Sequence, residues 1–137
     1  MKTTVIKIAT IVILIATTSI IAGATNIGTI SVHWSTSSNC SPLATTDRWE
    51  VSLVILNYPS LTGFCPLQTF QYVNESSGVQ QFYESCACND SQAKYLVIAV
   101  VRLIRNGQII GQGEYRSVMT CNDLYQLDNI YLTCSCE

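Results

Sequence analysis

Residues 95–104 read YLVIAVVRLI and are followed, after Arg105, by the dipeptide Asn106-Gly107. The β-branched and large apolar residues of this segment occupy both faces of an extended chain, which is typical of a strand covered from two sides. Asn-Gly is the preferred pair for a two-residue type I′ hairpin, because both positions need positive φ. The sequence therefore predicts a buried strand that turns at Asn106-Gly107 and returns through residues 108–119.

The same alternation with a period of two extends outward from this hairpin in both directions. It predicts further strands over residues 30–35, 49–56, 70–73, 80–86 and 130–134, and a short helical turn over 123–128. Turn signals separate these segments, and neither sustained helical periodicity nor an internal repeat is found. We therefore predict an all-β fold, an antiparallel β-sandwich of about 7–8 short strands. A small closed barrel is the alternative.

The first 24 residues have the features of a secretory signal peptide. Lys2 and Lys7 precede an uncharged, isoleucine-rich run, and Ala22-Gly23-Ala24 provides the small residues that signal peptidase requires. An uncleaved membrane anchor is the alternative, but threonine and serine dilute a span that should be strongly apolar. We expect cleavage after Ala24, no stable membrane anchor, and a single β-sandwich domain over residues 25–137 that is secreted.

Removal of the leader makes the chain acidic. Five basic residues then face nine acidic ones, which gives a net charge of −4. Nucleic-acid binding needs a concentrated basic face, and the sequence does not provide one. No cofactor-binding motif follows the leader, so we expect neither nucleic acid nor a cofactor as a partner.

Seven cysteines follow the leader, and in an exported domain this density indicates disulfides. We expect three disulfides, of open connectivity, among Cys40, Cys65, Cys86, Cys88, Cys121 and Cys134. In each C-x-C pair we expect one cysteine to face the core and the other to face away. Cys136, one residue from the C-terminus, is therefore the candidate for an unpaired or intermolecular thiol, which would allow a disulfide-linked homodimer.

A zinc site built from the two C-x-C pairs is the alternative to the disulfides. Structural zinc sites more often use C-x2-C, and an oxidising compartment competes for the thiolates. Oxygen ligands for calcium at Asn89-Asp90, Asp123 and Asp128 match no known loop motif. We therefore expect no metal.

Three sequons lie in predicted loops, where a glycan is tolerated. They are Asn39-Cys-Ser41, Asn74-Glu-Ser76 and Asn89-Asp-Ser91. Asn39 is the weakest of them, because a disulfide at Cys40 would compete with glycosylation. The sequons favour a secreted glycoprotein.

Catalytic signatures are weak. His33 is the single histidine, lies in a predicted strand and faces away from the core row, and the sequence holds no G-x-S-x-G or comparable nucleophile turn. The acid pairs Glu84 with Asp90 and Glu50 with Glu114 are more simply scattered surface carboxylates. We predict that the protein is not an enzyme; a small hydrolase acting through His33 is a further alternative.

Tyrosine is enriched at recognition surfaces, and the chain has seven tyrosines. Tyr58, beside a proline, and Tyr115, near two glycines, are the candidates for exposed binding contacts. We expect an extracellular binding or structural module whose partner is an extracellular protein or a glycan. The alternatives are a secreted protease inhibitor or toxin-like effector, which uses the disulfide-braced loop 57–65, and a self-assembling coat, matrix or filament subunit.

Overall fold

The computed structural model describes residues 26–137, so the predicted leader lies outside the described residues. This part of the chain is nearly all β and confirms the predicted disulfide-stapled all-β fold. Its elements are β1 (Gly28–Thr36), η1 (Ser38–Cys40), β2 (Arg48–Tyr58), β3 (Gly63–Val73), β4 (Ser77–Glu84), β5 (Lys94–Arg105), β6 (Gln108–Thr120), α2 (Cys121–Tyr125) and β7 (Asn129–Cys136). Among these residues, neither helix is long and apolar enough to cross a membrane.

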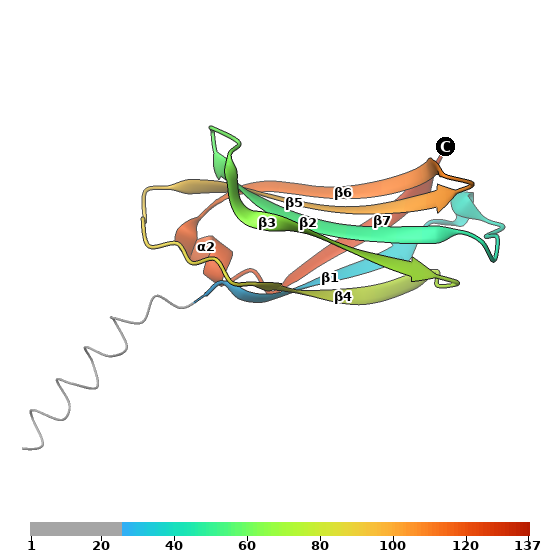
Figure 1. Ribbon diagram of the computed structural model, residues 1–137, viewed down its shortest axis with the longest axis horizontal. Helices are drawn as coiled ribbons and strands as arrows, with labels where there is room; N and C mark the ends of the chain where they lie inside the picture. Colours follow the sequence, from blue (N-terminus) through green and yellow to red (C-terminus); the bar gives the residue numbers. More distant parts are fainter. Residues whose placement is uncertain (1–25) are drawn as a thin grey trace, which may run out of the picture.

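The seven strands form one sheet in the order β3-β2-β5-β6-β7-β1-β4. Only Gly111 with Cys136 and Gln112 with Ser135 pair β6 to β7, so the sheet folds over at this junction. Figure 1 shows the resulting two layers, β3, β2, β5 and β6 in one and β7, β1 and β4 in the other, with β7 rising obliquely from β1 to β6 and β3 descending toward β4. The sheet is nearly closed, which agrees with the predicted barrel alternative while keeping the two-layer character of a sandwich.

All strand pairs are antiparallel except one. β1 and β7 run parallel, with Val32 level with Ile130 and Trp34 level with Leu132. Parallel neighbours need a long connection, and here the connection is most of the domain. The antiparallel prediction is wrong at this pair, because the sequence of neither strand indicates in which direction a distant partner strand runs.

The barrel is closed between β3 and β4 by side chains and one disulfide instead of backbone pairing. The Cys65–Cys86 disulfide ties β3 to the chain just after β4. Gln68 Nε2 donates to the carbonyl oxygen of Tyr83 over 3.0 Å. The Phe70 and Phe82 rings meet edge to face, with centroids 5.4 Å apart. This seam is the one side of the sheet without a strand ladder.

The segment that decides the fold becomes the central strand β5, between β2 and β6. Its odd-numbered side chains from Tyr95 to Leu103 are buried, whereas Ile98 and Val100 on the other face are only half-buried. The strand is therefore fully covered on its core face, whereas its other face is covered only in part. Asn106 and Gly107 have φ values of 52° and 77°, as the predicted type I′ turn requires.

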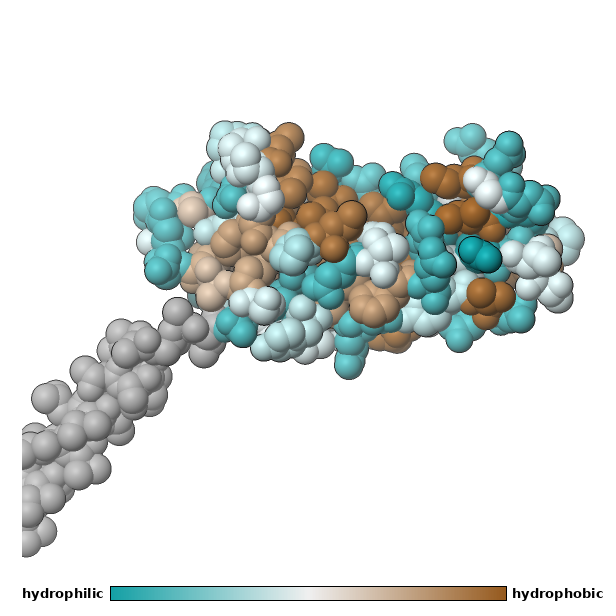
Figure 2. Space-filling model, in the orientation of Figure 1, coloured by the Kyte–Doolittle hydropathy of each residue, from teal (hydrophilic) through white to brown (hydrophobic). Residues whose placement is uncertain are grey.

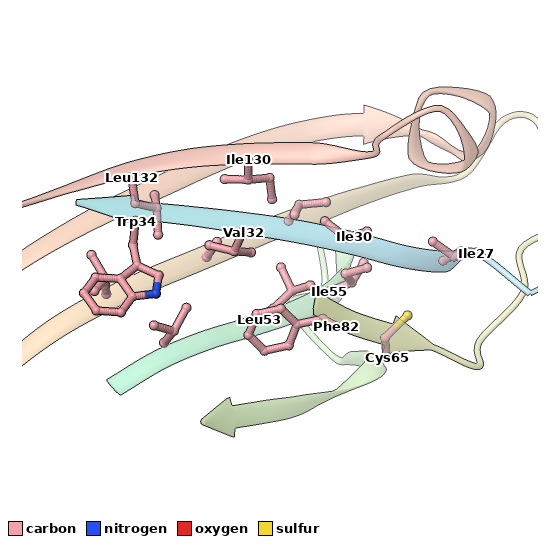
Figure 3. Packing of buried hydrophobic residues seen from close by; sticks show 14 of the residues in the cluster. Ile27, Ile30, Val32, Trp34, Leu53, Ile55, Cys65, Phe82, Ile130 and Leu132 are labelled. Atoms are coloured by element: carbon pink, nitrogen blue, oxygen red, sulfur yellow. The ribbon is translucent and has the colours of Figure 1, made fainter. Parts of the chain in front are cut away.

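The core lies between the two layers (Figure 3). Ile30, Val32 and Trp34 of β1 point toward Leu53 and Ile55 of β2. The Trp34 ring also packs on the rings of Trp49 and Tyr72, with centroids 5.2 Å and 5.6 Å away. Alternate residues of β1 are thereby fixed inside, and the residues between them are fixed outside.

The predicted bounds of β3 and β4 were wrong. β3 begins at Gly63 instead of residue 70, and it contains Pro66. An edge strand tolerates a proline because its outer N–H groups need no partner, so the turn residues there did not end the strand. β4 ends at Glu84, before Cys86.

Three disulfides join Cys40 to Cys136, Cys65 to Cys86 and Cys88 to Cys121, while Cys134 is free and buried. The assignments of Cys134 and Cys136 were therefore wrong. Residues two apart in a strand share a face, so Cys134 and Cys136 point the same way. Cys134 follows Ile130 and Leu132 into the core. Cys136 lies at the strand end, where η1 brings Cys40 to it.

Candidate binding face

The outward side chains of β4, β1 and β7 form a surface that we call the neutral face. Because alternate residues of β1 fill the core, the residues between them point outward, and the register places them beside the outward residues of β4 and β7. The neutral face consists of Thr29, Ser31, His33, Ser35, Ser77, Val79, Gln81, Tyr83, Asn129, Tyr131, Thr133 and Ser135. The three strands contain one acidic residue, Glu84, and it is buried. Apart from Val79, hydroxyl, amide and aromatic groups therefore make up the face, which has no carboxylate, ammonium or guanidinium side chain and one imidazole, that of His33.

Tyr131 is the most exposed large hydrophobic side chain of the described residues, with 73% of its area accessible. Its ring stacks on the His33 ring, with centroids 4.5 Å apart and planes inclined by 15°. His33 Nε2 lies 2.8 Å from Asn129 Oδ1, which fixes the imidazole in place. Because His33 covers one face of the Tyr131 ring, the exposed area is the opposite face and the edge.

Tyr83 is the second exposed ring of the neutral face, with 60% of its area accessible. Asn26 Nδ2 donates to its hydroxyl oxygen over 3.1 Å. The register places Tyr83 beside Thr29 and Tyr131 beside His33, on strands either side of β1. The usual strand rise and spacing then separate the two tyrosines by about 16 Å.

A row of polar side chains crosses the face between the two rings. Gln81 and Asn129 flank Ser31 on neighbouring strands. Their amide and hydroxyl groups offer both donors and acceptors. The face therefore presents hydrogen-bonding groups in the middle and one braced ring toward each end.

The other layer of the sheet carries the strand charges. Arg48, Glu50, Arg102, Glu114 and Arg116 lie on β2, β5 and β6. Arg116 Nε pairs with Glu114 Oε1 over 2.8 Å. Figure 2 shows apolar side chains gathered near the β2–β3 hairpin of this layer. The two surfaces of the sheet therefore differ sharply in chemistry.

The two tyrosines chosen from the sequence lie elsewhere. Tyr58 ends β2 and is 43% exposed, as expected. Tyr115 stands level with buried Ala99 and is itself half-buried against the core, so its choice as an exposed contact was wrong. Tyr83 and Tyr131 were missed. Their outward positions follow from period-two alternation, but their shared face depends on the pairing of both strands with β1.

His33 points outward, as the alternation predicted. The partners that the structure gives it are the amide oxygen of Asn129 and the ring of Tyr131. Neither group is the serine, cysteine or carboxylate that a Ser-His-Asp or Cys-His arrangement would place beside the imidazole. The arrangement instead orients two rings on a surface.

Two acids are buried elsewhere, and they differ in their surroundings. Asp47 accepts from Arg105 Nε and Nη2 over 2.8 and 2.7 Å, and this guanidinium holds the pKa of Asp47 below its usual value. Burial raises the pKa of Glu84 to about 7, although the amide of Gln68 favours the charged form. Glu84 Oε1 has no hydrogen-bond partner.

Glu84 also lies beside the seam disulfide. One oxygen of its carboxyl group and the sulfur atoms of Cys65 and Cys86 lie within 4.8 Å of one another. The two sulfur atoms are bonded to each other, so they do not offer thiolates to a metal. The cluster is therefore a disulfide with a buried acid next to it.

The asparagines of the three sequons are all exposed, but they differ in their hydrogen bonds. Asn74 lies in the turn between β3 and β4 and Asn89 in the loop after β4, and both are exposed. Asn39 instead bonds to the backbone of Cys136, through Nδ2 to the carbonyl oxygen and through Oδ1 to the N–H. A sugar on Asn39 Nδ2 would compete with this contact, whereas Asn74 and Asn89 leave room for one.

One open depression of about 340 Å³ lies between the loop before β2 and the turn after β3. Asn74 and Glu75 border it on one side and Asp47 on the other. Since the Asp47 carboxylate is already paired with Arg105, the depression presents no free buried acid there. The neutral face is thus the better-organised surface. No known protein family, curated protein or solved structure matches the chain.

Proposed function

We propose that this protein is an exported recognition module that binds its ligand on the neutral face. The observation that carries the proposal is the pair of exposed tyrosines, Tyr131 and Tyr83, each held by a neighbouring side chain. Tyrosine is favoured at recognition surfaces because it offers a rigid apolar body with a polar tip. Rings that are already held in place lose less conformational entropy on binding.

Export is part of the same proposal. Three disulfides, one of them across the β3–β4 seam, fit an oxidising compartment, and the leader predicted over residues 1–24 provides a route to it. The neutral face offers groups that stack and hydrogen-bond. Its one histidine is engaged by an amide and a phenol, which favours binding over catalysis.

The test is a binding screen of the mature protein against arrays of immobilised oligosaccharides and of secreted proteins and receptor ectodomains. Tyr131→Ala is compared with Tyr58→Ala, which removes an equally large exposed ring from the end of β2. We expect Tyr131→Ala to abolish the signals seen with the wild type and Tyr58→Ala to retain them. Signals that persist in Tyr131→Ala and disappear in Tyr58→Ala would move the binding site to the β2–β3 hairpin.

The protease-inhibitor alternative has one observation in its favour. The β2–β3 hairpin projects from the barrel (Figure 1), and Asn57 Nδ2 braces its tip through Thr62 and Gly63. Leu61 at the tip is 53% exposed, but its φ of 60° is a turn conformation and not an extended one. Stoichiometric inhibition of any protease in a panel, lost in Leu61→Asp, would support this alternative.

A further inference from the structure

We infer that the ligand of the neutral face is an uncharged oligosaccharide that spans Tyr131 and Tyr83. The inference rests on the proposed function and names the chemical class of its ligand. Its starting observation is the complete outward row of three neighbouring strands, which has no Asp, Glu, Lys or Arg and in which the one imidazole, that of His33, is engaged by Asn129 and Tyr131. A charged ligand would give up water there without gaining an opposite charge.

Charge therefore excludes several ligand classes from this surface. Phosphates, sulfated or uronic-acid glycans and acidic peptides need cationic partners, and the strand arginines lie on the other layer of the sheet. Basic peptides need carboxylates, and the sole acid of the three strands, Glu84, is buried. An uncharged ligand can bind this face without giving up the hydration of a charged group.

The hydrogen-bonding groups of the face match sugar hydroxyls. A hydroxyl group donates one hydrogen bond and accepts others, so it pairs equally well with amides and with other hydroxyls. The row of Gln81, Ser31 and Asn129 supplies such groups between the two rings. The short side chains of Ser31 and Asn129 also have few rotatable bonds to immobilise.

The tyrosines supply the second element of sugar recognition. The C–H face of a pyranose ring is apolar and packs flat against an aromatic ring. Tyr131 offers such a face, because His33 occupies only one side of its ring and 73% of the side chain remains exposed. Tyr83 lies about 16 Å away. A ligand that contacts both rings must therefore be an oligomer.

A folded protein partner fits the same face less well. Protein interfaces have a contiguous apolar core surrounded by a polar rim. On the neutral face the apolar side chains Val79, Tyr83 and Tyr131 lie among serine, threonine, glutamine and asparagine. The contiguous apolar residues of the outer surface, such as Val54 and its neighbour Ile98, lie on the other layer.

The experiment is isothermal titration of the mature, disulfide-bonded protein with cellohexaose, mannohexaose and chitohexaose. The disaccharides of the same sugars and the anionic hexamer of galacturonic acid are the comparison ligands. We expect binding of at least one neutral hexamer, much weaker binding of its disaccharide, and none of the galacturonate. The affinity should be the same at low and high salt, because no ion pair contributes.

Variants locate the site. Tyr131→Ala and Tyr83→Ala should each weaken hexamer binding about tenfold, which is the loss expected for one stacking contact, and Tyr58→Ala should leave it unchanged. Gln81→Ala, on the exposed face of β4, is a second probe that leaves both rings in place, and it should also weaken binding. Near-UV circular dichroism of each variant checks that the fold is retained.

The outcomes separate this inference from the proposed function. Binding of a secreted protein that Tyr131→Ala abolishes, with no affinity for any neutral hexamer, would overturn the oligosaccharide and leave the recognition face in place. Hexamer binding that is unaffected by Tyr131→Ala, Tyr83→Ala and Gln81→Ala would overturn both. Preferential binding of the galacturonate hexamer would overturn the uncharged class.

Discussion

The buried carboxyl group of Glu84 makes the stability of this protein dependent on pH near neutrality. Its side chain is 0% exposed, and Oε1 has no hydrogen-bond partner. Burial raises its pKa from the ordinary 4.5 to about 7. The folded protein therefore prefers the neutral acid, whereas the unfolded chain ionises at lower pH.

The direction and size of the effect follow from linkage. Between pH 4.5 and about 7 the folded state holds a proton that the unfolded chain has released, so the free energy of unfolding falls as the pH rises through this window. At 1.36 kcal/mol per pH unit, the full shift amounts to at most about 3 kcal/mol. Glu84→Gln is neutral at every pH. It should therefore lose this dependence and exceed the wild type in stability above pH 7.

The assay is urea denaturation at several values between about pH 5 and pH 8, with the disulfides intact, followed by the fluorescence of buried Trp34 and Trp49. Glu75→Gln, which removes an exposed carboxylate from the turn before β4, is the matched control and should keep the wild-type pH profile. The reasoning is refuted if Glu84→Gln loses as much stability as the wild type between these two pH values.

The remaining predictions concern packing, the odd thiol and the sequons. Gly78→Ala should lower the free energy of unfolding by about 2 kcal/mol, because a Cβ there lies 3.0 Å from the Trp34 ring, whereas Gly63→Ala, with nothing within 4 Å, should be neutral in the same urea titration. Burial raises the pKa of the Cys134 thiol, so iodoacetamide should label this cysteine only after unfolding. A non-reducing gel should show a monomer. Labelling of the native protein would contradict the burial of Cys134. Peptide mapping of the exported protein should find sugar at Asn74 and Asn89 and none at Asn39, whose amide is bonded to β7.

Much of the fold could be predicted from local pattern. The strand over 95–104 and its Asn106-Gly107 turn could be predicted from neighbouring residues, because alternation and positive φ are properties of a few consecutive positions. The same holds for β1, β2, β6 and β7, whose predicted centres lie within the observed strands. Errors concentrated at β3, where turn residues and a proline are tolerated because the strand lies at an edge.

The candidate site could be predicted only in part. Alternation placed His33 outside the core, and composition pointed to tyrosine as a contact residue. Tyr83 and Tyr131 were not selected, because the chain gives no local sign that β4 and β7 lie on either side of β1. Cys134 and Cys136 were assigned wrongly because they share one face of β7, and only the position of η1 decides which of them meets Cys40.

By itself the sequence determined the class of the fold, the tight hairpin, the cysteine-rich character and the acidic charge of the chain beyond residue 24, all of which depend on composition or on residues close together in the chain. The tertiary structure alone decided the parallel pairing of β1 with β7, the disulfide partners, the uncharged face and the burial of Glu84. These features depend on which distant segments become neighbours, and that choice minimises the free energy of the whole barrel instead of any one strand.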